Sequence, residues 1–559
     1  MLVNLPSIMI PYPKLLLLFW MFRFIRQNRY IPILVVVVLA FVLRVYSISK
    51  LPPGLYDDEV AIGYNAYSIL TRGTDEYGTP FPLTFRSFDD YKLPGYIYLD
   101  TVPIALFGKN AFAVRLPSAV SGTLTVLFLY LFLENLLSLE PEQLRKKFRN
   151  LPLLSALILA ILPWHLQFSR AAYESVVAVC FFMIGCWQFV VFYKNKKIPF
   201  LLISLLFFTL ASYTYHSFRI LTPIAFLLIF YFLFIKRFIK VKNLFLIAFY
   251  VLILNLPLLI FTFGSHGTSR FLETSTFTTQ ALPSSIQQII PTPTQKIPTA
   301  AVPQPQFSVQ ALLAYPFVYL QNFLSFFSLE ELFVRGNDNV RFYSSSEFGF
   351  LFRWQLPFLI VGLLVLLHEK SKILKKMVLS MLFVTPAAVA IAASPNALHA
   401  LLLVIPFSII IALGINDIGQ NSFRWVKLIF IAIIILGVYE TGLYFHLYLS
   451  DYKDSYTVFW GGAQEKLVKE VTKYSKWYPT IVINETYLPN EKIYFLFYND
   501  KLKPVFVDSS WQEPKSWNDK PFLYVRYPLT IPANSGMKLL ENVTLDIPSK
   551  NTVAQIIEL

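Results

Sequence analysis

The sequence predicts a polytopic α-helical membrane protein with a small α/β domain at its carboxyl end. Three observations support this fold class: an apolar composition, long apolar runs that recur along the chain, and an alternating charge in the segments between them. Of the 559 residues, 56% are hydrophobic and 14% are charged, and the mean hydropathy is +0.55. Soluble domains carry about 25% charged residues, and disordered chains are poor in apolar residues. The composition therefore excludes a soluble enzyme and a disordered chain.

Apolar runs of up to about 20 residues, the length that crosses a bilayer, predict about eleven transmembrane helices. The first run follows a basic stretch, as in a signal peptide, but no small-residue cleavage site follows it, so we expect an anchor. An earlier run at 15–22 is too short to span; we expect either that it lies on the membrane surface or that Met21 is the true start. The eleven runs lie at 31–46, 112–135, 151–167, 173–193, 199–213, 219–235, 243–263, 352–368, 377–393, 398–415 and 428–447.

The connections between these runs alternate in charge. On one side, the short loops add little beyond Arg170 and Arg219. By the positive-inside rule, the opposite, basic side and the amino terminus are cytoplasmic. The formal net charge of +15 is therefore mainly a topology signal, and no nucleic-acid partner is expected. The basic clusters lie at 145–149, 194–197, 236–242, 370–376 and 424–427.

This sidedness divides the chain into three parts. We expect a cytoplasmic segment at 1–29, a transmembrane domain at 30–448 and an extracytoplasmic α/β domain at 449–559, which has the size of an ordinary domain. Within the last part, the sequence pattern predicts two helices and three strands. The helices are expected at 464–475 and 491–498, and the strands at 480–484, 521–527 and 552–557.

Two long segments of the predicted transmembrane domain also fall on the outer side. They are the first outer loop at 47–111 and a long outer loop at 264–351, which contains a flexible Pro-, Gln- and Thr-rich linker at 281–310. An apolar stretch at 311–329 is interpreted as a surface-lying or re-entrant helix. Charged residues are sparse inside the spans and no internal repeat is evident, which disfavours a transporter with a site at mid-membrane. The pattern indicates chemistry at the outer membrane surface.

The first outer loop carries the strongest functional signal. After a Pro-Pro-Gly sequence that ends the first span, Asp57, Asp58 and Glu59 stand in the predicted first turn of a helix. Acidic residues at this place cap a helix and interact favourably with its dipole, but three adjacent acids exceed what a cap needs. An ionised carboxylate at the membrane surface can act as a general base on a hydroxyl.

About thirty residues further on, the segment FDDYKLPGYIYL adds Asp89, Asp90 and the cation Lys92. Aromatic side chains crowd both pieces, among them Tyr91, and most are expected to be interfacial anchors. The acids of the two pieces offer oxygen ligands for a divalent ion, although no spacing rule demands one. No His and Cys cluster has zinc spacing. No cofactor is firmly implied, and a divalent metal ion stays open as an alternative.

The order of these motifs resembles a known family. The acidic pair after the first span, the Lys-x-Pro segment and the sequence FAVRLPSA entering the second span are similar to polyprenyl-phosphate-sugar-dependent glycosyltransferases. More specifically, the chain resembles the bacterial branch of glycosyltransferase family 39, whose relatives include dolichyl-phosphate-mannose–protein mannosyltransferases and the lipid A aminoarabinose transferase. The resemblance covers about residues 30–450 and implies the GT-C fold. Single motifs are weak, but their order and sidedness together are specific.

The resemblance also implies a catalytic pair. In the family, an Asp-Glu pair in the first outer loop supplies the catalytic carboxylate, which matches Asp58 and Glu59. We expect Asp58 to be the general base and Glu59 to orient it or the acceptor. One departure stands near Ser394, where the family's Pro-His-Ala-Leu-Arg is replaced by SPNALHALL. The chain lacks that arginine and has His399 nearby. We therefore assign no phosphate-binding residue to this loop.

Cations are expected to stabilise the charge that develops on the leaving phosphate. The candidates are Lys92, Arg170 and Arg219, although the two arginines have the alternative of being interfacial anchors. Further substrate-binding residues are expected from the second outer loop (163–175), from the third outer loop (212–223) and from residues 326–358, which resemble the family's long external loop. For the histidines, the alternative is a structural role at the membrane interface, with their hydrogen bonds satisfied. The expected substrate-binding residues are Asp57, Asp90, Tyr91, His165, Glu174, Tyr215, His216, Arg335, Asp338 and Asn339, and Arg341 lies in the same loop sequence.

The function that the resemblance implies is that of an inverting glycosyltransferase. It would move a hexose or pentose, as mannosyltransferases do, from a polyprenyl-phosphate donor to an acceptor hydroxyl at the outer face of the cytoplasmic membrane. The expected partners are the lipid-linked sugar, a protein, lipid or glycan acceptor, and membrane lipids. Two other classes stay open: a transporter or lipid flippase, and a non-catalytic scaffold whose tail binds a partner.

Overall fold

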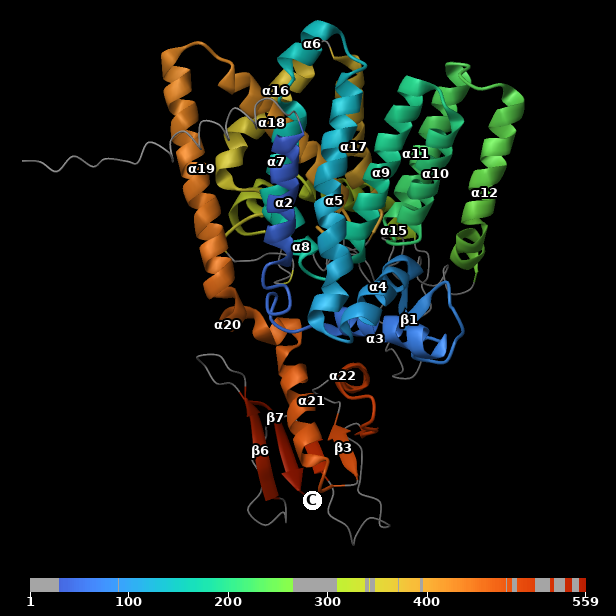
Figure 1. Ribbon diagram of the computed structural model, residues 1–559, viewed down its shortest axis with the longest axis vertical. Helices are drawn as coiled ribbons and strands as arrows, with labels where there is room; N and C mark the ends of the chain where they lie inside the picture. Colours follow the sequence, from blue (N-terminus) through green and yellow to red (C-terminus); the bar gives the residue numbers. More distant parts are fainter. Residues whose placement is uncertain are drawn as a thin grey trace, which may run out of the picture.

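The structure is a helical bundle with a smaller sheet-containing unit at one end (Figure 1). The expected amino-terminal segment 1–29 and residues 281–308 of the expected linker at 281–310 lie outside the residues that it describes. The computed structural model describes residues 30–88, 90–264, 309–336, 341, 347–369, 371–392, 396–478, 480–484, 490–507, 523–526, 538–544 and 552–558.

A helix coincides with each of the eleven predicted runs. Six helices of the described residues are long and apolar enough to cross a membrane, and α7 with α8, bent by 59°, makes a seventh span if the two are one. Pro163, which lacks an amide hydrogen, begins α8 at this break. The count of eleven spans therefore stays a prediction. The helices are α2 Ile31–Val45, α5 Ala111–Leu137, α7 Leu151–Ile161, α8 Pro163–Ser169, α9 Glu174–Asn195, α10 Ile198–Ser212, α11 Phe218–Ile235, α12 Val241–Phe263, α16 Leu356–His368, α17 Lys372–Val389, α18 Val404–Gly419 and α19 Arg424–Ser450.

The two ends of the bundle differ in character. The short basic helix α6 (Glu142–Lys147) and the connection between α11 and α12 lie at one end, whereas α3 (Asp57–Arg72) and α4 (Pro94–Phe107) lie at the other (Figure 1). The basic connections and the first outer loop are thus separated by the length of the bundle, as the charge alternation predicts. Many apolar side chains of α12 and α19 are exposed, as expected for faces that contact lipid.

The first outer loop contains more structure than the sequence pattern indicates. α3 begins at Asp57 as expected and ends at Gly73, which adopts a left-handed conformation. A short antiparallel hairpin of β1 (Phe85–Ser87) and β2 (Asp90–Lys92) follows, with Phe85 opposite Lys92. Pro94 then starts α4, where its fixed φ suits the first helical turn. The hairpin carries Lys92 back toward the start of α3.

The part of the chain that follows α19, here called the C-terminal unit (449–559), contains the predicted helices α21 and α22 and the three predicted strands. Two further strands, β4 and β6, are too short or too irregular to show a period of two in the sequence. The sheet order is β4-β3-β5-β7-β6, parallel at β4-β3-β5 and antiparallel beyond. The elements are α20 Tyr452–Tyr456, α21 Gly462–Tyr474, β3 Ile481–Asn484, α22 Glu491–Tyr498, β4 Val505–Val507, β5 Leu523–Arg526, β6 Lys538–Thr544 and β7 Thr552–Glu558.

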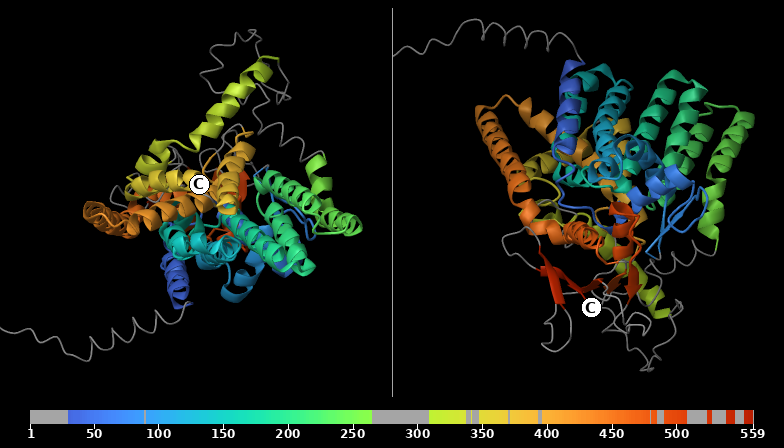
Figure 2. Two further views of the ribbon diagram at one scale, coloured as in Figure 1. Left: turned by 90° about the horizontal axis from the view of Figure 1, so that it is seen from above. Right: turned by 60° about the horizontal axis from the view of Figure 1, so that its bottom comes forward.

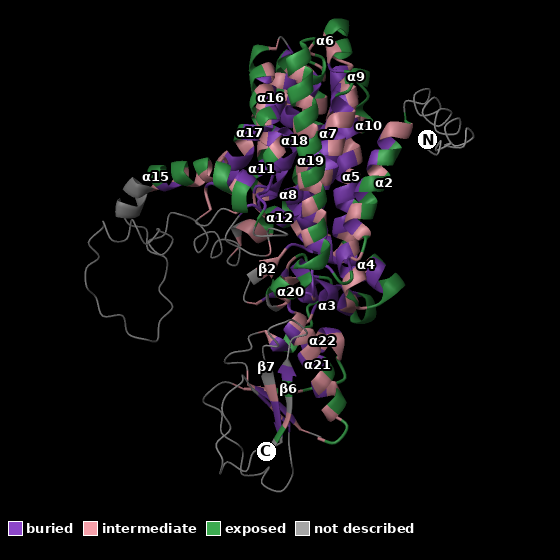
Figure 3. Ribbon diagram, turned by 90° about the vertical axis from the view of Figure 1, so that its left-hand side faces the viewer, coloured by how far each residue is buried: buried purple, intermediate pink, exposed green. Residues whose placement is uncertain are grey.

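The apolar stretch at 311–329 forms α15 (Val309–Ser325), which projects from the side of the bundle (Figures 2 and 3). This direction agrees with the expectation that it is not a further span. Two large hydrophobic cores hold the rest together. One fills the bundle, and the other joins α3 and α4 to α21, α22 and the sheet, so the first outer loop is packed between the bundle and the C-terminal unit.

Candidate active site at the first outer loop

Asp58 and Lys92 form an ion pair at the end of the bundle. Asp58 comes from the first turn of α3, and Lys92 is the last residue of β2. The Asp58 side chain is 42% exposed, whereas that of Lys92 is 13% exposed. The pair therefore presents an accessible carboxylate with a cation held beside it, which is what proton abstraction next to a phosphate requires.

Glu59 has a different environment from its neighbour. It is fully buried, and its two oxygens accept hydrogen bonds from Arg115 Nε and Nη2, both at 2.8 Å. Glu59 Oε1 also accepts the backbone N–H of Ala172 at 2.9 Å. These bonds fix α3 against α5 and the start of α9, which fits the expectation that Glu59 orients Asp58 better than a contact with the acceptor.

Arg115 extends this anchorage to the chain segment before α3. Its Nη1 donates to the carbonyls of Ile48 and Pro52, at 3.0 and 2.7 Å, and its Nη2 donates to that of Gly54. Arg115 lies in the sequence FAVRLPSA, where nothing in the pattern distinguishes it from an interfacial anchor. The one available signal is an arginine at the outer end of a span, 56 residues after Glu59.

Asp57 points to the C-terminal unit. Its Oδ1 accepts a hydrogen bond from Tyr494 Oη at 2.8 Å, and its Oδ2 accepts one from Asn490 Nδ2 at 2.9 Å. Both oxygens are thus engaged by the protein. The carboxylate joins α3 to α22, and substrate binding by Asp57 stays a prediction.

Arg170 is buried in a cage of protein acceptors. It is 2% exposed, and its nitrogens donate to Tyr448 Oη at 3.0 Å and to the carbonyls of Leu43, Tyr46 and Leu51 at 2.6, 2.8 and 3.1 Å. These bonds use all three guanidinium nitrogens. These contacts favour a role for Arg170 in fixing the end of α2, and donor-phosphate binding by this residue stays a prediction.

Arg219 lies on the third outer loop beside the hairpin. Its guanidinium carbon is 5.4 Å from the ring centroid of Phe261, which is 6.0 Å from that of Tyr91 in β2. Gly95 N–H donates to Tyr213 O at 3.0 Å and ties the start of α4 to the same loop. Phe261 thus connects Arg219 to Tyr91, which precedes Lys92 in β2.

The other two residues expected on the third outer loop face a different segment. The Tyr215 ring is 6.1 Å from that of His399 and 6.3 Å from that of His216, measured between centroids. Tyr215 is buried and His216 is partly exposed. His399 therefore meets the third outer loop, although Ser394 itself lies outside the described residues.

On the second outer loop, His165 and Glu174 differ in burial and in environment. His165 is fully buried, with Nδ1 2.9 Å from Arg44 Nη2, which favours the alternative of a satisfied histidine over a substrate contact. Glu174 begins α9 and is partly exposed. Burial raises the pKa of Tyr56 well above its ordinary value, and the charges of Tyr173, Asp58 and Glu174 add to this effect. Glu174 is therefore electrostatically close to the turn that carries Asp58.

Arg341, on the long outer loop, places a guanidinium group near the turn that carries Asp58. Its guanidinium carbon lies 4.7 Å from the ring centroid of Tyr56, the residue that precedes the acids. Burial lowers the pKa of Arg341, but Tyr173, Tyr56 and Asp58 raise it by more, so it stands above its ordinary value. This arginine of the long outer loop is thus charged and within electrostatic reach of Asp58.

The remaining expected residues are not gathered here. Arg335 is exposed and pairs with Glu330, Nε to Oε1, at 3.1 Å. The backbone of Asp90 pairs with Ser87 in the hairpin, and its side chain is not described. Asp89, Asp338 and Asn339 lie outside the described residues.

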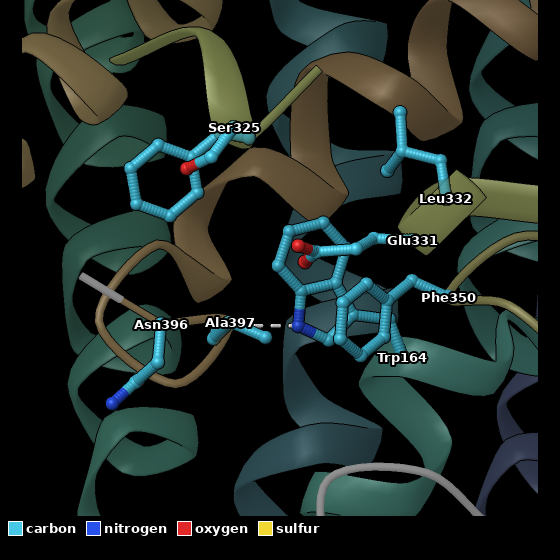
Figure 4. A pocket seen from close by; sticks show the side chains of 8 residues that line it. Trp164, Ser325, Glu331, Leu332, Phe350, Asn396 and Ala397 are labelled. Atoms are coloured by element: carbon cyan, nitrogen blue, oxygen red, sulfur yellow. Dashed lines mark hydrogen bonds between the residues drawn. The ribbon is translucent and has the colours of Figure 1, made fainter. Parts of the chain in front are cut away.

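A small pocket lies elsewhere, between α8, the end of α15 and the segment 396–397 (Figure 4). The Trp164 indole donates to Ala397 O at 3.2 Å and stacks on Phe350 with centroids 4.8 Å apart. The side chain of Glu331 also lines this pocket (Figure 4). Neither Asp58 nor Lys92 lines this pocket. The residues that line the pocket are Trp164, Ser325, Phe326, Glu331, Leu332, Phe350, Asn396 and Ala397.

The acidic residues of the first outer loop left open the alternative of a divalent metal site. Within the part of the chain that the structure describes, no group of three or more His, Cys, Asp or Glu side chains is placed to hold a metal ion. The acids at 57, 58 and 59 turn to three different partners, so they do not converge on a common point. Cys180 and Cys186 are both buried and free.

Comparisons with known proteins agree with this architecture. Residues 92–261 match the family described as dolichyl-phosphate-mannose-protein mannosyltransferase. The fold is similar to the crystal structure of ArnT from Cupriavidus metallidurans bound to undecaprenyl phosphate, with a TM-score of 0.55 and 10% identity, over 94% of this chain and 97% of that chain. For ArnT in the apo state the TM-score is 0.51 and the identity 11%, with the same coverage. No curated protein matches the chain. The family match over residues 92–261 and the likeness of the fold to ArnT agree with the expected fold class, a helical membrane protein of the GT-C type.

Proposed function

We propose that this protein transfers a sugar from a polyprenyl-phosphate donor to an acceptor hydroxyl at the membrane surface. The observation that carries the proposal is the exposed carboxylate of Asp58 paired with Lys92. The likeness of the fold to ArnT, which was crystallised with undecaprenyl phosphate, supports a lipid phosphate as the leaving group.

The donor would keep its lipid tail in the bilayer and present its phosphate at the end of the bundle. Lys92, Arg219 and Arg341 are the cations proposed to receive it. A partly exposed ion pair such as Asp58–Lys92 is worth only about 0–1 kcal/mol. The donor phosphate would therefore draw Lys92 away at small cost and leave the Asp58 carboxylate open to the acceptor.

In the proposed reaction, the acceptor oxygen attacks the anomeric carbon of the sugar. The bond between that carbon and the phosphate oxygen breaks, and its electron pair leaves with the polyprenyl phosphate. Asp58 takes the proton of the acceptor hydroxyl. One direct displacement inverts the anomeric configuration. Removing one preorganised donor of charge stabilisation costs about 2.7–4 kcal/mol in comparable sites, which is the scale proposed for Lys92.

The finer identity follows the same resemblance. We propose a hexose or pentose as the sugar, a protein, lipid or glycan hydroxyl as the acceptor, and the outer face of the cytoplasmic membrane as the place. The proposed domains are 30–448 for the transmembrane part and 449–559 for an extracytoplasmic part. The comparisons do not favour the transporter or flippase alternative, because the matched family and the similar structures are those of glycosyltransferases.

Transfer and flipping differ in their products, so one experiment separates them. The full chain is reconstituted in liposomes with a lipid extract of the source membranes, radiolabelled in its sugars, and with an unlabelled protein and glycan extract of the same membranes as acceptor. The proposal predicts that free polyprenyl phosphate and a labelled product that is no longer linked to it appear together. Movement of intact labelled lipid between leaflets, without release of polyprenyl phosphate, would instead identify a flippase.

A further inference from the structure

The C-terminal unit reaches the residue that precedes the candidate base. Tyr494 and Asn490, from α22 and its start, bind the two oxygens of Asp57 at 2.8 and 2.9 Å. Tyr494 Oη also lies 3.1 Å from Leu55 O. The hydroxyl has one hydrogen, so it is shared between a side chain and a backbone carbonyl at the start of α3. The side chains of Tyr494 and Asn490 thus bind the first turn of α3, although they lie more than 430 residues from Asp57 in sequence.

The backbones come into direct contact at the same place. A Cβ on Gly461 would lie 2.1 Å from Leu55 O and 2.5 Å from Tyr494 Oη, and its φ of +69° favours glycine. A Cβ on Gly54 would lie 2.5 Å from Gly462 N, at a φ of +87°. No side chain fits between these segments, so the position of the C-terminal unit determines where the start of α3 lies.

Other contacts hold the two parts together away from this turn. Lys109 pairs with Asp500, Nζ to Oδ2, at 3.4 Å and donates to Leu496 O at 3.3 Å. The ring of Phe497 packs against Gly63, where an added Cβ would lie 2.7 Å from it. Removing the Tyr494 hydroxyl would therefore leave the C-terminal unit docked.

Tyr494 is suited to donate at any physiological pH. Burial raises the pKa of its hydroxyl far above the ordinary value, and the adjacent charge of Asp57 raises it further. The phenol keeps its proton and the bond to Asp57. Asn490 adopts a left-handed conformation with a φ of +66°, which asparagine tolerates, and this places its amide at the start of α22 beside Asp57.

We propose that Tyr494 and Asn490 are positioning residues for sugar transfer. By fixing Asp57, they fix the first turn of α3 and the direction in which Asp58 faces donor and acceptor. The other side of this turn is fixed by Glu59 and Arg115, so Asp58 stands between two anchors. A misplacement of about 1 Å in a catalytic group costs up to about 100-fold in rate. The inference rests on the proposed function, and it makes the C-terminal unit part of the catalytic apparatus.

The decisive variant is Tyr494→Phe, which removes the hydroxyl and keeps the ring. Its matched control is Tyr498→Phe, because the Tyr498 hydroxyl donates to Glu465 at 3.2 Å within the C-terminal unit. With the full chain in liposomes and the radiolabelled lipid extract as donor, Tyr494→Phe is expected to lower kcat about tenfold or more. The half-saturating donor concentration and the melting temperature stay as in the wild type, and Tyr498→Phe keeps its kcat. Unchanged kcat in Tyr494→Phe overturns the proposal.

A double-mutant cycle tests whether the bond to Asp57 carries the effect. Asp57→Ala and Tyr494→Phe should lower kcat by similar factors, and the double variant should be no slower than Asp57→Ala alone. Fully additive losses would show that Tyr494 does not act through Asp57, and would overturn the mechanism.

Failure of the proposed function is recognised separately, because the wild-type chain would then release no polyprenyl phosphate. In that case hydrogen exchange of residues 55–62, which needs no substrate, still tests the fixation of the turn. Exchange is expected to be faster in Tyr494→Phe than in the wild type or Tyr498→Phe. Equal exchange in all three proteins overturns the positioning role.

Discussion

Glu59 and Arg115 form a fully buried ion pair, with Arg115 Nη2 2.8 Å from Glu59 Oε2. It joins the helix that carries the candidate base to the first long span of the bundle, α5. The neighbours of Glu59 in sequence have other partners: Asp57 contacts the C-terminal unit, and Asp58 pairs with Lys92 at the surface. One turn of helix thus combines two anchors with one accessible carboxylate.

Breaking the buried pair should unfold the site rather than only slow the reaction. Arg115→Ala leaves the Glu59 carboxylate buried without its cation, and such losses cost about 3–5 kcal/mol. We expect a clearly lower melting temperature in detergent, measured by intrinsic fluorescence. Lys146→Ala, which removes an exposed pair with Glu142, is the control and should melt as the wild type does. Equal melting of both variants would contradict the anchoring role of Arg115.

Lys92 should matter to the donor rather than to the fold. Lys92→Ala is expected to reduce turnover of the lipid-linked sugar by about 100- to 1,000-fold, because the leaving phosphate loses a preorganised cation. Lys92→Arg should recover part of this loss. The measurement is release of polyprenyl phosphate, with Lys453→Ala on α20 as the control for removal of a surface charge. Wild-type turnover in Lys92→Ala would remove this residue from the site.

The two arginines of the outer loops should separate by phenotype. Arg170→Gln removes hydrogen bonds to Tyr448 and to the carbonyls that follow α2, so it should lower the melting temperature. Arg341→Gln should leave the melting temperature unchanged and lower donor turnover, because its cation lies beside the acidic turn. Melting curves and turnover on both variants decide the question, and the reverse pattern would restore Arg170 as a donor-binding residue.

Glu76 predicts a pH dependence of stability. Burial raises its pKa from 4.5 to about 7, an effect that the hydrogen bond from Asn65 only partly offsets. The folded state therefore binds this proton more tightly than the unfolded state, so the free energy of unfolding falls as the pH rises from about 4.5 to about 7. Glu76→Gln should melt higher than the wild type at pH 8 and similarly at pH 4.5. Glu142→Gln, on the exposed helix α6, should show no such difference, and a pH-independent effect of Glu76→Gln would contradict this explanation.

The sequence predicts the parts of this protein that depend on local pattern. Apolar runs and basic connections indicate the helices and their ends, and the motif order indicates Asp58 and Lys92. The sequence does not predict that Asp57, Asp58 and Glu59 have three different partners and therefore three different roles. Successive helical residues point about 100° apart, so their partners depend on how α3 packs against α5 and α22. For the same reason, Arg170 and His165 match a family pattern in sequence, yet packing turns both inward.

The most direct test of the central claim is the turnover of Asp58→Asn. This change removes the basic carboxylate and nearly keeps its shape, and general base catalysis contributes about 100- to 10,000-fold in rate. With the reconstituted full chain and the radiolabelled lipid extract, Asp58→Asn is expected to lose nearly all release of polyprenyl phosphate while melting like the wild type. Asp454→Asn, on the exposed surface of α20, is expected to keep full turnover. Near wild-type turnover in Asp58→Asn would contradict the assignment of Asp58 as the catalytic base.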